Sequence, residues 1–242
     1  MPVHCFYWRE EILGYRAGWV KGHLQILFTI GIFVLPVIQV EAEKRTLAIL
    51  HTNDFEGRFE QMLKVAPVFS RVQREVGRVL LLDAGNALAP SEDAFVHPNK
   101  RGTLTLALLN RAGYHAWTLG WRAFDRPVDR LTGYLRGTDF SVLGANLHRS
   151  ETGRHLFQVQ PYTVVRTGGL RVGVLGLGAG VRGVMVANPV AAARYFVPLL
   201  RQSSDVVVLL THLGFEADST LAASVPGIDV IVGRRTSGSL ES

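Results

Sequence analysis

The sequence predicts an α/β fold in which mostly parallel strands alternate with helices. Apolar runs of strand length recur after residue 43, and segments with helical periodicity lie between several of them. The runs are Leu47–Leu50, Val79–Leu82, Tyr162–Val165, Val172–Leu175, Val206–Leu210 and Ile228–Val232, and the helical segments are roughly 61–75, 101–112, 124–136 and 189–202. Continuous Val, Leu and Ile runs are typical of strands buried on both faces. Their alternation with helices indicates a layered α/β architecture.

Composition is that of a chain able to build a buried core. Hydrophobic residues make up 48% and charged residues 19% of the sequence. Its 242 residues are enough for one sizeable domain, or for one domain with a short N-terminal extension. Cys5 is the single cysteine, which excludes an internal disulfide and a cysteine-based metal cluster. The net charge of +6 permits contact with anions. Because no dense Lys/Arg run is present, we expect a solvated basic surface and no nucleic-acid partner.

The N-terminal region contains an uncharged apolar stretch, residues 24–38, with the sequence LQILFTIGIFVLPVI. As a helix it spans about 22 Å, short of the roughly 30 Å hydrocarbon core, and so fits a signal-peptide core better than a membrane span. Val40 and Ala42 offer small residues for cleavage. We predict a signal peptide or membrane anchor over 1–42 and an exported domain over 43–242, with membrane contact only through this segment. The alternative is a buried core helix.

Polar, glycine-containing loops follow the apolar runs. Functional residues of layered α/β folds collect in the loops after the carboxyl ends of strands. The loops are His51–Gly57, Asp83–Asn86, Gly120–Ala123, Thr211–Gly214 and Gly233–Ser237. The sequence therefore predicts that these five loops together form a functional site.

A second glycine-rich stretch invites another interpretation. Gly173, Gly176, Gly178 and Gly180 superficially suggest a phosphate-binding loop. They lack the strand-then-helix context that a dinucleotide fingerprint requires. We therefore expect these glycines to serve tight turns after a strand.

The five loops, in order, resemble the metal-binding blocks of the calcineurin-like metallophosphoesterases, and most of all their 5′-nucleotidase and UDP-sugar hydrolase branch. Members of that branch read HTND-x-HG, DAGD, GNHEFD, SHLG and GGHTH. The matching stretches here are LAILHTNDFEGR, VLLLDAGN, YHAWTLGWRAFD, VVVLLTHLGFEAD and VPGIDVIVGRRTSG, over about residues 46–240. The resemblance implies a four-layer α/β/β/α sandwich. This chain is compatible with a version of the sandwich without its last strands. We expect the family's C-terminal nucleotidase domain to be absent.

The resemblance also implies a site for two divalent ions that clamp a phosphoryl group. Two of the family's ligands are unchanged, Asp54 and His212. Glu56 stands in place of the first histidine and Asn86 in place of the bridging aspartate. Both can act as substitute ligands, although a neutral amide is a poor bridge between two dications.

The remaining positions lose their metal-binding chemistry. Trp121, Arg122 and Ala123 replace the asparagine, the catalytic histidine and the glutamate of the third block. In the last block, Arg235 and Ser237 replace the two histidines and Arg234 replaces a glycine. Guanidinium groups stay protonated and repel a nearby dication. We hypothesise that arginines pair with Asp54 or Glu56 through two-point bonds and stabilise the pocket in place of metals.

The sequence thus predicts a catalytically impaired homologue in which Arg122, Arg234 and Arg235 bind a phosphate-containing small molecule. No residue is assigned a catalytic role, and any divalent metal is expected to be weak, single or absent. One alternative is an active hydrolase with a single metal on Asp54, Glu56, Asn86 and His212. Another is a truncated or decaying gene product.

Overall fold

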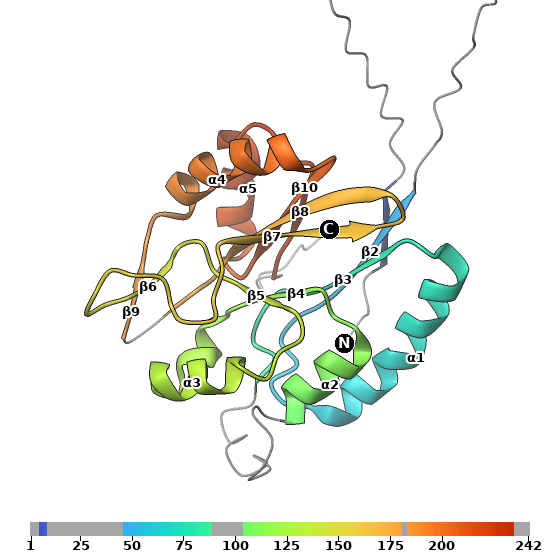
Figure 1. Ribbon diagram of the computed structural model, residues 1–242, viewed down its shortest axis with the longest axis horizontal. Helices are drawn as coiled ribbons and strands as arrows, with labels where there is room; N and C mark the ends of the chain where they lie inside the picture. The colour runs from blue at the N-terminus through green and yellow to red at the C-terminus, as the bar shows by residue number, and fades with distance from the viewer. Residues whose placement is uncertain (1–4, 9–45, 89–103, 181–182, 235–242) are drawn as a thin grey trace, which may run out of the picture. The chain divides into compact units, whose positions relative to one another are not determined.

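The computed structural model describes residues 5–8, 46–88, 104–180 and 183–234, whose arrangement Figure 1 shows. The chain divides into two compact units, residues 1–7 with 47–242 and residues 8–46. The second unit lies almost wholly outside the described residues, and so does the predicted export segment. None of the helices in the described ranges combines the length and apolarity needed to cross a membrane.

The first sheet has the strand order β1-β2-β3-β4-β5. Its strands are β1 (Cys5–Trp8), β2 (Leu47–Thr52), β3 (Val79–Asp83), β4 (Ala116–Thr118) and β5 (Ser141–Leu143). Strands β2 to β5 are parallel. The helices α1 (Phe59–Val76), α2 (Leu104–Ala112) and α3 (Val128–Leu135) cover one face of this sheet. Phe69, Leu106 and Leu131 of these helices pack in one cluster with Leu50 and Leu81 of the sheet.

The second sheet has the order β11-β10-β8-β7. Its strands are β7 (Tyr162–Thr167), β8 (Leu170–Leu177), β10 (Val206–Thr211) and β11 (Val230–Val232). Helices α4 (Pro189–Ser203) and α5 (Phe215–Ser224) cover its outer face (Figure 1). A separate antiparallel pair joins β6 (Leu147–Arg149) to β9 (Val184–Val186).

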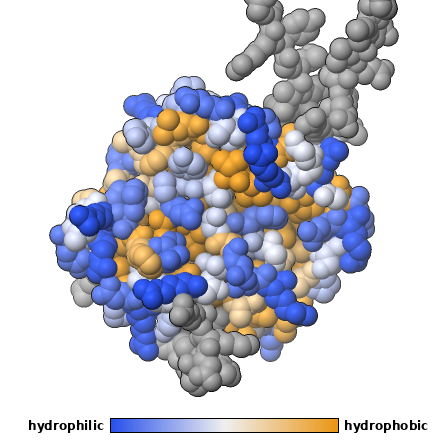
Figure 2. All heavy atoms as spheres, in the orientation of Figure 1, coloured by the Kyte–Doolittle hydropathy of each residue, from blue (hydrophilic) through white to orange (hydrophobic). Residues whose placement is uncertain are grey.

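The two sheets pack face to face through a cluster of their own. Ile49 and Leu80 of the first sheet meet Val172, Val174 and Val208 of the second. Alternate residues of each strand point to opposite faces, so every central strand serves both this core and a helix-side core. The layers therefore run helix, sheet, sheet, helix, which confirms the predicted α/β/β/α sandwich. On the face in Figure 2, hydrophilic residues are interspersed with hydrophobic ones.

Strand β7 was predicted to be buried on both faces, and this prediction is wrong. It is an edge strand, pairs antiparallel with β8 and alternates between half-buried and exposed residues. Gly168 and Gly169 form the two-residue turn between the strands, with φ angles of 56° and 79°. Such a turn requires positive φ at both positions and therefore produces a hairpin rather than a crossover.

The glycines of β8 also differ from their prediction as turn residues. Gly173 and Gly176 lie inside the strand, which runs from Leu170 to Leu177. A Cβ at Gly173 would overlap Ser204, and one at Gly176 would overlap Leu143 of the neighbouring sheet. These positions lack a side chain because other elements approach the backbone closely.

Candidate functional site

The loops after β2 and β3 lie side by side and continue the pairing of their strands. The amide nitrogens of Asp54, Glu56 and Gly57 donate hydrogen bonds to the carbonyl oxygens of Gly85, Asn86 and Ala87, at 2.9, 2.8 and 2.9 Å. Parallel strands bring their carboxyl ends to the same edge of the sheet. This backbone ladder is therefore what holds two of the five predicted loops together.

Three side chains of this ladder stand on left-handed backbone. The φ angles are 55° at Asp54, 50° at Glu56 and 57° at Asn86, and among the described residues only Gln158 adds another non-glycine residue of this kind. Such conformations are unfavourable for L-residues and concentrate at functional sites, where the surrounding structure maintains them. The three are positions that the sequence predicts as metal ligands or their substitutes.

Both carboxylate oxygens of Asp54 accept hydrogen bonds from amide side chains. Asn86 Nδ2 donates to Oδ1 at 2.9 Å, and Asn53 Nδ2 donates to Oδ2 at 2.8 Å. The Oδ1 of Asn86 in turn accepts the backbone amide of Arg122 at 3.1 Å. Asn86 is thus fixed on both sides, with its N–H group directed at the carboxylate.

Glu56 pairs with the arginine of the third loop. Arg122 Nε donates to Glu56 Oε1 at 2.7 Å, and the two side chains are 28% and 31% exposed. Arg58 approaches the other carboxylate oxygen at 3.6 Å. The Arg122 guanidinium also lies 4.4 Å from the ring centroid of Trp121, a favourable cation–π position. A single hydrogen bond from Nε joins Arg122 to Glu56, whereas the sequence predicted a two-point bond.

His212 enters the site from the end of β10 and is 2% exposed. Its Nδ1 lies 2.5 Å from the carbonyl oxygen of Ala84, while Nε2 is buried without a hydrogen-bond partner. Burial lowers the pKa of the imidazole below its ordinary value, against the opposing effects of Ala84 and Asp54. The ring is therefore neutral at pH 7, with Nδ1–H donating to Ala84 and a lone pair on Nε2.

Close packing of the loops brings His212 to this place. A Cβ at Gly85 would collide with the His212 ring, and one at Gly120 would collide with the Asn86 side chain. Gly85 also has a φ of 106°, which favours glycine. These two glycines allow the loops after β3, β4 and β10 to meet.

The last loop contributes Arg234, whose Nε lies 3.8 Å from Asp54 Oδ2. Arg234 is 32% exposed and Asp54 is 20% exposed. Arg235 and Ser237, which the sequence also placed in this loop, lie outside the described residues. The structure thus brings together Asp54, Glu56, Asn86, Arg122, His212 and Arg234.

Asp83 is a buried acid beside the site that sequence reasoning did not single out. Its oxygens accept hydrogen bonds from Thr52 Oγ1 at 2.6 Å and from the Gly85 amide at 2.9 Å. The Thr52 hydroxyl continues the network to Tyr114 at 2.9 Å. Burial raises the pKa of Asp83 to about 7. The available signal was its place as the last residue of an apolar run, where a polar side chain ends a buried strand.

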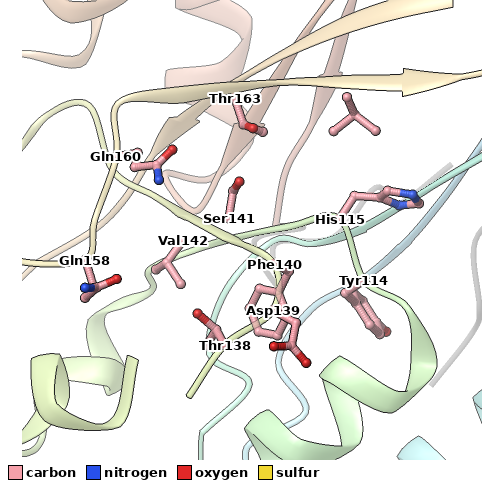
Figure 3. A pocket seen from close by; sticks show the side chains of 11 residues that line it. Tyr114, His115, Thr138, Asp139, Phe140, Ser141, Val142, Gln158, Gln160 and Thr163 are labelled. Atoms are coloured by element: carbon pink, nitrogen blue, oxygen red, sulfur yellow. The ribbon is translucent and has the colours of Figure 1, made fainter. Parts of the chain in front are cut away.

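A cavity of about 420 Å³ lies elsewhere, beside the N-terminal ends of β4 and β5 and against β7 (Figure 3). Polar side chains line most of it, among them Thr138, Asp139, Ser141, Gln158, Gln160 and Thr163. None of the predicted site residues lines this cavity. The chemistry predicted from the sequence belongs to the loops at the opposite strand ends.

No family model matches the chain. It is 31% identical to the 5′-nucleotidase of Rattus norvegicus over 229 residues, which cover 81% of this chain and 38% of that protein. The crystal structure of a 5′-nucleotidase precursor from Thermus thermophilus matches with 29% identity and a TM-score of 0.69, covering 78% of this chain and 41% of that one.

This chain belongs to the 5′-nucleotidase family of calcineurin-like metallophosphoesterases. The calcineurin-like phosphoesterase YfkN of Bacillus subtilis shares the fold, with a TM-score of 0.68 at 22% identity over 81% of this chain and 73% of that one. The chain spans about two fifths of the length of the curated relatives that it matches first.

The described residues do not fit the two-ion centre that the family resemblance implies. Amide N–H groups occupy both oxygens of Asp54, and an arginine pairs with Glu56. Ala123 is buried in the helix-side core, and Trp121 offers no lone pair. The described ranges contain no group of three or more His, Cys, Asp or Glu side chains arranged to hold a metal. One element of a ligand set remains, the unpartnered Nε2 of His212.

Proposed function

We propose that this 5′-nucleotidase-type homologue binds a phosphate-containing small molecule and hydrolyses it slowly or not at all. The observation that carries the proposal is the 2.7 Å ion pair between Arg122 and Glu56. This pair places a permanent positive charge where a phosphoesterase of the family would need a group able to assist the leaving oxygen. A guanidinium does not give up its proton, so it can bind an anion but cannot act as a general acid.

Two arginines give the site its affinity for anions in this proposal. Arg122 and Arg234 come from different loops and pair with different carboxylates, Glu56 and Asp54. The Arg122 and Arg234 side chains are 28% and 32% exposed, so a ligand can reach them from solvent. A phosphate carries more charge than a carboxylate and offers more acceptor oxygens, so it competes well for a guanidinium.

Phosphate binding and hydrolysis are tested separately on the full chain. Calorimetric titration with inorganic phosphate and with a nucleoside monophosphate is expected to show binding that Arg122→Gln weakens by about tenfold or more. Arg74→Gln is the matched control, because it removes the same charge from an exposed position on α1. Equal binding by wild type and Arg122→Gln would overturn the anion site.

Hydrolysis is measured with nitrophenyl phosphate and nucleotides in the presence of Mn²⁺, Mg²⁺, Zn²⁺ or Ca²⁺. We expect no metal-dependent turnover. We also expect elemental analysis of the purified protein to find no stoichiometric metal. Two ions per purified chain would contradict the proposal that arginine–carboxylate pairs replace the metals.

A second candidate function is phosphoester hydrolysis with one divalent ion on Asp54, Glu56, Asn86 and His212. The observation that favours it is the buried Nε2 of His212, which has no hydrogen-bond partner. Such a nitrogen destabilises the protein, and a bound ion would give it a partner. This function requires metal-dependent turnover that Asp54→Ala and His212→Ala abolish. Turnover that survives both substitutions would exclude it.

Export of the chain is a further proposal, which rests on the uncharged stretch 24–38. We expect the protein in an exported or membrane fraction, and deletion of this stretch should retain it in the cytoplasm. The remaining alternative, a decaying gene product, predicts poor soluble expression of residues 43–242.

A further inference from the structure

Two histidines and a methionine lie in a row on one side of the β6–β9 ribbon, outside the five predicted site loops. His148 of β6 is paired directly opposite Met185 of β9. On the other edge of β6, His148 forms an antiparallel bridge with His155. Residues paired directly across antiparallel strands point to the same face, with Cβ atoms about 4.5–5.5 Å apart. The three side chains therefore share one face of the β6–β9 ribbon. Figure 1 shows where this ribbon lies in the fold.

The two imidazoles are in contact, with ring centroids 4.6 Å apart and planes inclined by 32°. Nitrogens that bind one ion at about 2.0 Å each lie about 3–4 Å apart. Small rotations of the two side chains can reach that spacing from the observed contact. Desolvation, and then the neighbouring His148, lower the pKa of His155 below its ordinary value.

His148 has an unsatisfied polar atom at the centre of this row. Its Nδ1 is buried and has no hydrogen-bond partner. Buried polar atoms without partners are rare, and each calls for a water, an ion or another explanation. Met185, which is paired opposite His148, is 46% exposed.

We propose that His148, His155 and Met185 form a binding site for a soft monovalent metal ion, copper(I). Thioether sulfur selects copper(I) over hard divalent cations, and imidazole is a good ligand for the same ion. The nearby arginine on β6 does not oppose this charge, because Arg149 pairs with Asp129 at 2.8 Å and with Glu151 at 3.2 Å. The site lies outside the five metallophosphoesterase loops.

The site is tested by competition titration of the full chain with copper(I), under anaerobic conditions and against a chromogenic copper(I) chelator. All variants carry Cys5→Ser, so that the cysteine thiol cannot contribute. We expect one equivalent of copper(I) to bind, and both Met185→Leu and His155→Gln to weaken it by about tenfold or more. Met185→Leu should leave the weaker binding of Zn²⁺ unchanged, since zinc gains little from a thioether.

His212→Gln separates this site from the phosphoesterase loops and is expected to keep full copper(I) affinity. Met185→Leu and His155→Gln replace exposed side chains, so their unfolding temperatures without metal should match that of the parent. Copper(I) binding that is lost in His212→Gln and retained in Met185→Leu would overturn the proposal. So would the absence of binding to the parent chain.

Discussion

At the scale of single residues, an amide takes the position that the family resemblance gives to a bridging aspartate. Asn86 donates to Asp54 Oδ1 at 2.9 Å and accepts from the Arg122 amide at 3.1 Å. An ionised aspartate could still accept from the Arg122 amide but could not donate to Asp54. Two carboxylates at this distance repel each other unless a cation lies between them. The N–H group of Asn86 thus does locally what a cation would do, since it holds Asp54 in place.

The substitution Asn86→Asp should therefore make the protein dependent on a cation. We expect it to lower the free energy of unfolding by about 1–3 kcal/mol in EDTA, since it removes a donor and adds a like charge. Added Mn²⁺ should restore part of this loss. Urea denaturation with and without Mn²⁺ measures both effects.

Asn110 provides the matched control for that experiment. Its amide is also used at both ends, with Nδ2 donating to the Gly137 carbonyl and Oδ1 accepting the Asp139 amide. Asn110→Asp should destabilise the protein without any response to Mn²⁺, because Asp54 is not its partner. A similar Mn²⁺ response in both variants would contradict a specific role for Asn86.

The Arg122–Glu56 pair should contribute little to stability. Both side chains are about 30% exposed, and pairs of that kind are worth about 0.2–1 kcal/mol. A double-mutant cycle with Arg122→Gln and Glu56→Gln, measured by urea denaturation at low and moderate salt, should give a coupling in that range that decreases with salt. A coupling above about 2 kcal/mol would mean that the pair is structural rather than available to a ligand.

At the scale of elements, the contact between the two sheets depends on Gly176, a position of β8 without a side chain. Gly176→Ala should lower the free energy of unfolding by about 1–3 kcal/mol, because its Cβ would overlap Leu143 across the sheets. Gly133 lies exposed inside α3, where an added methyl group would meet open space, and Gly133→Ala should stabilise by about 0.5–1 kcal/mol. Urea denaturation of both variants measures these opposite changes in the free energy of unfolding. Equal changes in the two variants would contradict the packing argument.

The long buried strands were predictable because their sequences are continuous apolar runs. β8 and β10 contain Val172–Leu175 and Val206–Leu210, as expected. β4 and β5 were not predicted, since each has three residues and ends or begins with a polar one. Helix α5 was also missed, because it buries only Leu221 and shows no clear apolar stripe.

The candidate site was predictable to the extent that it follows strand ends. Asp54 and Asn86 come after buried runs that form neighbouring strands of one parallel sheet, so their proximity follows from that sheet. His212 comes after a strand of the second sheet, and its approach depends on how the two sheets pack. The partner of each arginine was not predictable, because it depends on left-handed backbone at Asp54 and Glu56 that no sequence pattern indicates. The buried network of Asp83 was not predictable either, because it contains Thr52 and, through Thr52, Tyr114, which come from other parts of the chain.

At the scale of the whole molecule, buried ionisable groups make stability depend on pH. Burial raises the pKa of Asp83 to about 7 and raises that of Asp218, while it lowers that of His212. A carboxyl whose pKa is raised by folding binds a proton more tightly in the native state, so its contribution to stability falls as pH rises. His212 acts in the opposite direction, because its neutral native form is favoured as pH rises toward 6.5.

The contribution of Asp83 can be isolated with Asp83→Asn. An amide keeps an acceptor for Gly85 and a donor for Thr52, as the protonated acid does, but it cannot ionise. With a pKa of 3.8 in the unfolded chain and about 7 in the native one, Asp83 should lose its contribution between about pH 4 and pH 7. From about pH 5 to pH 8 the wild type should therefore lose about 2–3 kcal/mol more unfolding free energy than Asp83→Asn. Urea denaturation across that range tests this, and parallel pH profiles for the two proteins would show that Asp83 is already ionised in the native state at the acid end of the range.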